Sequence, residues 1–169
     1  MNEMDIANII SLLEQMVEAH EELLATARSK KQAIIDNDLN ELTKYMMTEN
    51  RLVKRIGQLE SDRGMESTRL MATKGVFSRV PVTQKQLLSI VFDVEERMKL
   101  QQLHERLGKV VKELGRVNEA NQQLIKQSIE FVQFSLDVIL MPEDESYTYK
   151  NPTNARYDSF GYGRQQSRK

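Results

Sequence analysis

The sequence predicts an all-α protein, in which a long antiparallel helical hairpin and a long C-terminal helix form a coiled-coil-like three-helix bundle with a disordered tail. Three observations support this fold class. The 169 residues include only 6% aromatic residues and no Trp, which leaves little material for a β-sheet. The 3 prolines all lie at or after position 81. Apolar residues recur at steps of three and four over long stretches, as they do on one face of a helix.

The first two helices are expected to form a hairpin. The first helix runs from about Asp5 to Ile35, and the residues 36–38 that follow interrupt its apolar pattern. Asp38 with Glu41 predicts a capping box, in which the Asp38 carboxylate accepts a backbone N–H while the Glu41 side chain reaches back. Because about three residues join two long helices, these helices must be antiparallel. The inward face of the second helix is expected to carry Leu39, Leu42, Tyr45 or Met46, Leu52, Val53, Ile56 and Leu59.

A loop over 75–83 separates this hairpin from the remaining helices. Thr83 with Gln86 predicts the cap of a short helix. Either Asp93 with Glu96 caps a further helix, or the short helix simply continues. The last helix is expected to end at about residue 141, because Pro142 cannot continue it. Its heptad repeat has two seam positions, the first holding Leu100, Leu107, Leu114, Asn121, Ser128 and Ser135 and the second Leu103, Val110, Val117, Leu124, Phe131 and Val138.

A change in composition divides the chain into a helical domain over 1–141 and a flexible tail over 142–169. The tail contains no Ile, Leu, Val or Met. It therefore cannot bury enough apolar surface to offset the entropy lost on ordering. Four of the 5 tyrosines of the chain lie in this tail, namely Tyr147, Tyr149, Tyr157 and Tyr162.

Composition and motifs argue against several classes of function. The 24 Lys and Arg residues balance 25 Asp and Glu residues, whereas nucleic-acid-binding domains carry a basic excess. There is no Cys, and the 2 histidines, His20 and His104, lack metal-binding spacing. We expect His20 to lie on the apolar seam and His104 to face solvent. Since a Gly-rich phosphate loop is also missing from the sequence, we predict no enzyme activity, no metal and no cofactor.

The expected location is the cytoplasm. The first 20 residues lack the basic leading region of a secretory signal. No apolar run approaches the ~18 residues that a membrane span requires, so no membrane insertion is expected.

A second apolar stripe on the last helix is the strongest functional signal. Its residues follow steps of four and three and lie about 100° around the helix from the second seam position. The same track earlier in the helix is mostly polar or glycine, so the stripe begins abruptly at Ile125. Two interpretations remain open: the stripe packs between both helices of the hairpin, or it binds the amphipathic helix of a partner. The candidate partner-binding residues, stripe and neighbours together, are Ile125, Ile129, Phe131, Val132, Phe134, Leu136, Ile139 and Leu140.

Two segments resemble FlgN-type flagellar export chaperones. The segment 20–42 (HEELL, then KKQAIIDNDLNEL) is similar to the first hairpin of that family, with a heptad helix, a basic pair, a short turn and a DLxxL restart. The segment 117–140 (VNEANQQLI, then FVQFSLDVIL) is similar to its last helix. The likeness covers about residues 5–150 of the chain.

The resemblance implies a function. Chaperones of this family bind hook–filament junction proteins in the bacterial cytoplasm through the terminal helical segments of these cargo proteins. They keep the cargo unassembled and deliver it to the flagellar type III export gate. The resemblance further implies that the C-terminal helix binds cargo and that a tail tyrosine, best matched by Tyr149, contacts the export gate.

Two other classes of function compete with this one. A structural coiled-coil adaptor or dimerisation module would use the same helices without chaperone activity, and a homodimer is left open. A di-metal bundle enzyme would need paired Glu-x-x-His motifs facing the core. Neither the sequence around His20 nor that around His104 has this spacing.

Overall fold

The computed structural model describes residues 3–77 and 81–140, and the regular elements in these ranges are all α-helices. Helices α1 (Glu3–Ile35) and α2 (Leu39–Thr73) form the predicted hairpin, followed by the short α3 (Gln84–Ile90) and the 47-residue α4 (Val94–Leu140). The predicted all-α fold is therefore confirmed. The predicted tail over 142–169 lies outside the described residues.

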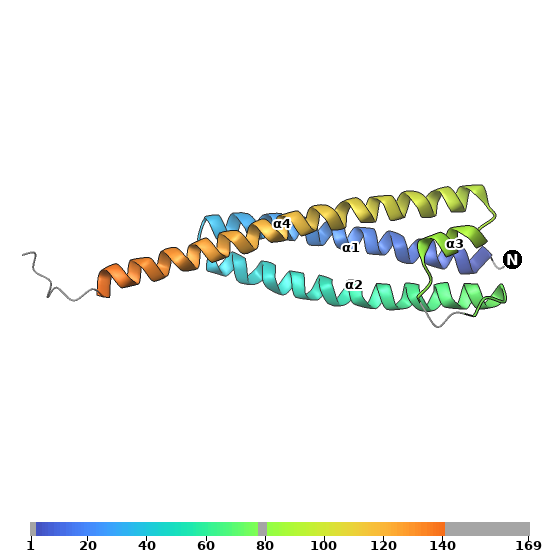
Figure 1. Ribbon diagram of the computed structural model, residues 1–169, viewed down its shortest axis with the longest axis horizontal. Coiled ribbons are helices and arrows are strands. Elements are labelled where there is room, and N and C mark those ends of the chain that lie inside the picture. The colour runs from blue at the N-terminus through green and yellow to red at the C-terminus, as the bar shows by residue number, and fades with distance from the viewer. Residues whose placement is uncertain (1–2, 78–80, 141–169) are drawn as a thin grey trace, which may run out of the picture. The chain divides into compact units, whose positions relative to one another are not determined.

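One compact unit, which ends at Phe131, holds α1, α2, α3 and most of α4. Within it, α4 runs beside α1 in the same direction, and α3 lies at the end where α1 begins (Figure 1). The end of α4, from Val132 onward, belongs to a second unit.

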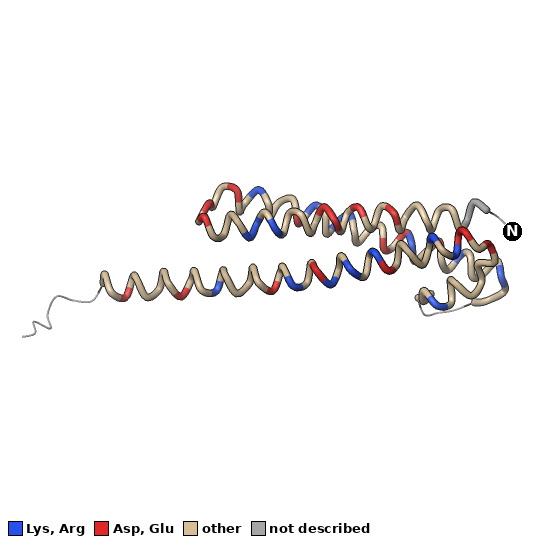
Figure 2. Tube along the Cα trace, turned by 90° about the horizontal axis from the view of Figure 1, so that it is seen from above, with Lys and Arg blue, Asp and Glu red and all other residues tan. Residues whose placement is uncertain are grey.

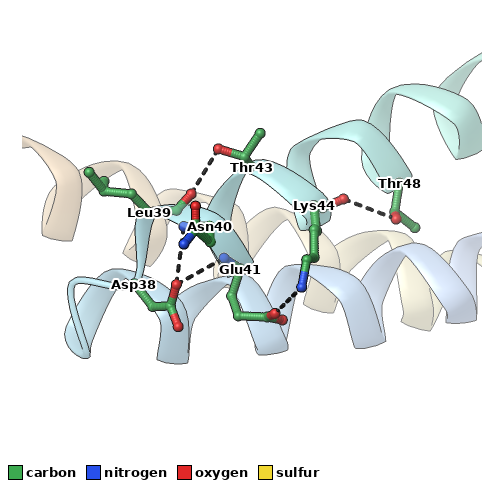
Figure 3. Close-up of polar contacts among 7 residues, drawn as sticks. All are labelled: Asp38, Leu39, Asn40, Glu41, Thr43, Lys44 and Thr48. Atoms are coloured by element: carbon green, nitrogen blue, oxygen red, sulfur yellow. Dashed lines mark hydrogen bonds and ion pairs between the residues drawn. The ribbon is translucent and has the colours of Figure 1, made fainter.

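Three residues make the turn between α1 and α2. Asn37 has a φ of 54°, a left-handed conformation that Asn tolerates better than most residues. The Asp38 carboxylate accepts hydrogen bonds from the backbone N–H groups of Asn40, at 3.1 Å, and Glu41, at 3.0 Å (Figure 3). This cap supplies acceptors for two of the N–H groups that the first turn of α2 leaves free.

The predicted capping box at this turn is only half formed. The Asp38 N–H donates to the Ala33 carbonyl at 2.9 Å and so closes the end of α1. The Glu41 carboxylate accepts instead from Lys44 Nζ at 2.6 Å. The prediction that Glu41 reaches back to Asp38 is therefore wrong, because the end of the preceding helix already uses that N–H.

The other two predicted caps are present. Thr83 and Gln86 form a complete capping box, in which the Thr83 N–H donates to Gln86 Oε1 at 2.9 Å and the Gln86 N–H donates to Thr83 Oγ1. The Glu96 N–H donates to Asp93 Oδ1 at 2.9 Å and begins α4. These caps fix the residues at which α3 and α4 begin.

A cluster of buried apolar side chains extends from the end of the bundle where α1 begins. All four helices contribute side chains to it, so this end anchors the start of α4. Its buried residues include Ile6, Ile9, Ile10 and Leu13 of α1, Leu70 and Met71 of α2, Leu87 of α3, Val91 beside it, and Leu100 of α4.

The first half of α2 buries a narrower face than predicted. Leu52 and Leu59 are buried, whereas Leu39, Met46 and Val53 are exposed. Consecutive residues of a helix lie 100° apart, so the residues next to the buried track turn away from α1. The prediction that Leu39 and Val53 face inward is wrong, whereas of the alternatives Tyr45 and Met46 it is Tyr45 that is half-buried.

Candidate partner-binding site

Helix α4 changes from a packed helix to an exposed one along its length. Leu100 and Asn121 are buried, with 1% and 2% of their surface exposed, and the seam residues between them are half-buried. The predicted second seam stays half-buried as far as Leu124, but Phe131 and Val138 are exposed. The prediction of a continuous seam is therefore wrong beyond Leu124. At the first seam position Leu gives way to Asn and Ser from residue 121 onward, and one apolar seam position per heptad cannot sustain coiled-coil packing.

The second stripe coincides with this exposed part of α4. Its exposed fractions run from 38% for Ile125 to 75% for Ile139, and the other candidate binding residues are also exposed. Ile125 and Ile129, the part of the stripe that lies in the first unit, are not buried by the hairpin. Charged residues are sparse here, as Figure 2 shows; residues 125–140 include only Lys126, Glu130 and Asp137. Exposed apolar surface of this length on a helix is typical of a binding face.

A ladder of ion pairs joins α4 to α1 before the stripe begins. Glu14 pairs with Lys99 at 2.8 Å, Glu21 with Arg106 through two bonds of 2.8 Å, and Arg28 with Glu113 at 3.4 Å. The pairs are spaced seven residues apart on both helices, as are ion pairs between neighbouring helices of a coiled coil. Sequence reasoning did not find this ladder, although its heptad spacing is visible on each helix.

One buried hydrogen bond continues the contact between these helices. Asn121 Nδ2 donates to the backbone carbonyl of Ala27 at 2.8 Å. Among the described residues, Asn121 Oδ1 has no hydrogen-bond donor although it is buried. This residue lies one helical turn before the start of the exposed stripe.

Near the middle of the bundle, a polar cluster consists of Glu60 and Arg63 of α2 with His20 and His104. Arg63 of α2 donates two hydrogen bonds to the Glu60 carboxylate, which hold the pKa of Glu60 below its ordinary value. His20 Nδ1 donates to the Met16 carbonyl at 2.7 Å, as expected for a satisfied seam histidine. His104 is half-buried with its Nε2 enclosed, so the prediction that it faces solvent is wrong.

The surroundings of His104 in this cluster explain its pKa. Burial lowers the pKa of His104, and the positive charge of Arg63 lowers it further against the opposing effect of Glu60. The folded bundle therefore favours the neutral form of His104. Within residues 3–77 and 81–140, no three His, Asp or Glu side chains gather closely enough to bind a metal ion.

We expect the lowered pKa of His104 to make folding pH-dependent. As pH falls below 6.5, the ordinary pKa of His, the unfolded chain takes up a proton that the folded bundle resists, so the free energy of unfolding decreases. His104→Gln should reduce this slope in urea unfolding measured by circular dichroism. Measurements at pH 8, where His104 is neutral in both states, control for packing. An unchanged slope in the variant would contradict the assignment.

Comparisons with known proteins show which family this chain resembles. The model of the FlgN protein family matches residues 1–156. A protein of Bacillus subtilis (strain 168), described as uncharacterized protein YvyG, is 27% identical over 150 residues, which cover 87% of this chain and 88% of the relative. No solved structure matches significantly. Across the described residues, no helix is apolar enough over a sufficient length to span a bilayer.

Proposed function

Because the chain belongs to the FlgN family of flagellar export chaperones, we propose that it binds hook–filament junction proteins in the cytoplasm. It keeps them unassembled and delivers them to the flagellar type III export gate. The observation that carries this proposal is the exposed stripe, in which Ile125, Ile129, Val132, Leu136 and Ile139 remain accessible on one helix.

An amphipathic segment of the cargo suits this surface. Its apolar side chains can pack against the stripe, as a helix packs in a groove. Full burial of a Val, Leu or Ile side chain contributes ~1.5–3 kcal/mol. The five stripe residues are already partly covered, so burying what remains exposed offsets only part of the ~4–15 kcal/mol lost on association. Further contacts of the cargo must supply the rest, and a weak contribution from the stripe suits a chaperone that must release its cargo.

A pull-down tests this function directly. The full chain, immobilised through an affinity tag, is incubated with purified hook–filament junction proteins and with versions that lack their terminal helical segments. We expect capture of the complete proteins and loss of capture for the truncated ones. The competing adaptor function predicts self-association in size-exclusion chromatography with light scattering and no capture of either version.

The tail is proposed to contact the export gate through Tyr149, on the basis of the family resemblance. A tyrosine carries a large ring and a hydroxyl at low ordering cost, which makes it an effective isolated anchor. Residues 142–169, including Tyr149, lie outside the described residues.

Removal of residues 142–169 should leave the melting temperature nearly unchanged and cargo capture intact, while secretion of the junction protein falls. Tyr149→Ala should reproduce much of this defect, and Tyr157→Ala and Tyr162→Ala should have milder effects. Junction protein in the culture medium of cells that carry each form provides the measurement. Normal secretion with the truncated form would leave the tail without this role.

A further inference from the structure

Asn121 is a polar residue at a buried position of α4. It is 2% exposed, at the same heptad position as the apolar Leu100, Leu107 and Leu114. It makes one hydrogen bond, to the Ala27 carbonyl, and its buried Oδ1 meets no donor among the described residues. A buried polar atom without a partner costs stability. In coiled coils, a single buried Asn with this cost specifies the register in which the helices pair.

The hydrogen bond of Asn121 favours one position of α4 along α1. The Ala27 side chain is a single methyl group, so a side chain from α4 can approach the backbone of α1 closely at this position. One heptad to either side, the corresponding residues of α1 are His20 and Ile34, both larger. Displacement by one heptad would therefore place the Asn121 amide against a larger side chain.

The ion-pair ladder favours the same position. Its first two pairs have the acid on α1 and the base on α4, but the third is reversed, with Arg28 on α1 and Glu113 on α4. A slip by one heptad in one direction would place Glu21 against Glu113, and a slip in the other would place Arg28 against Arg106. Like charges in neighbouring positions repel, so the reversed pair opposes both slips.

We propose that Asn121 and the reversed Arg28–Glu113 pair are positioning residues that set the register of α4 on α1 and so determine where the exposed stripe begins. A slip of seven residues moves α4 by ~10 Å along α1. It would change which residues around Ile125 and Ile129 are covered. The register is a property of the isolated chain, and only its consequence for cargo rests on the proposed function.

Distances between spin labels test the register. The chain contains no Cys, so Glu18→Cys with Lys126→Cys provides two unique labelling sites at exposed positions of α1 and α4. Double electron–electron resonance measures the distance between the two labels. It is applied to the otherwise unchanged chain and to the variant Arg28→Glu/Glu113→Arg/Asn121→Leu. This variant keeps the third ion pair but gives it the polarity of the other two, and it removes the buried amide. Asn118→Leu, a half-buried Asn on the same helix, is the matched control.

We expect one distance in the unchanged chain and in the control, and a second population displaced by ~10 Å in the triple variant. If half of the molecules slip, the Kd for cargo should rise about twofold. A single unchanged distance in the triple variant would overturn the proposal. If the variant with Asn121→Leu does not fold, Arg28→Glu/Glu113→Arg/Asn121→Ala gives a second measurement, because the smaller Ala side chain cannot overpack against Ala27. Because no cargo is needed, loss of cargo binding by the unchanged chain would refute only the proposed function.

Discussion

Ile129→Asp and Leu136→Asp should each weaken binding of the junction protein by about 30-fold, which corresponds to ~2 kcal/mol. Each substitution places a carboxylate where a cargo side chain would pack, and desolvation of that charge opposes binding. Isothermal titration calorimetry with a purified junction protein measures the effect.

Val111→Asp is the matched control for these variants. Val111 is an exposed apolar residue on the same track of α4, before the stripe begins. The same substitution there should change the Kd little, as should Glu105→Ala and Lys112→Ala. Melting temperatures near that of the unchanged chain confirm that the stripe variants remain folded. Folded variants with undiminished affinity would refute the assignment of the stripe as the cargo site.

Leu100→Ala should lower the free energy of unfolding by ~3 kcal/mol, because it removes a large side chain from the core. Leu100 is 1% exposed and contacts the cluster that all four helices build. Ile129→Ala, on the same helix but 52% exposed, should change that free energy by less than ~0.5 kcal/mol. Urea unfolding followed by circular dichroism compares the two. Similar losses in both variants would mean that the stripe contributes to the fold.

Local signals predicted most of the fold. The break at 36–38 and the caps of Asp38, Thr83 and Asp93 depend on backbone groups within a few residues, so the sequence alone indicates where α2, α3 and α4 begin. The full capping box at Thr83 and the half box at Asp38 have nearly the same sequence pattern. They differ because the preceding helix uses the Asp38 N–H.

Features that depend on the neighbouring helix were not predicted. His104 lies beside the seam in sequence, but its environment includes the charges of Glu60 and Arg63 of α2, more than forty residues earlier. The extent of the α4 seam likewise depends on where α1 and α4 remain in contact, which no heptad count reveals. The stripe at Ile125 was located by its spacing, while its exposure required the structure.

Hydrogen–deuterium exchange of the chain with and without a purified hook–filament junction protein tests the central claim most directly. The account predicts slower amide exchange over residues 125–140 when the junction protein is present, with little change over residues 99–113, where α4 already pairs with α1. Formation of a complex without any slowing over residues 125–140 would contradict it.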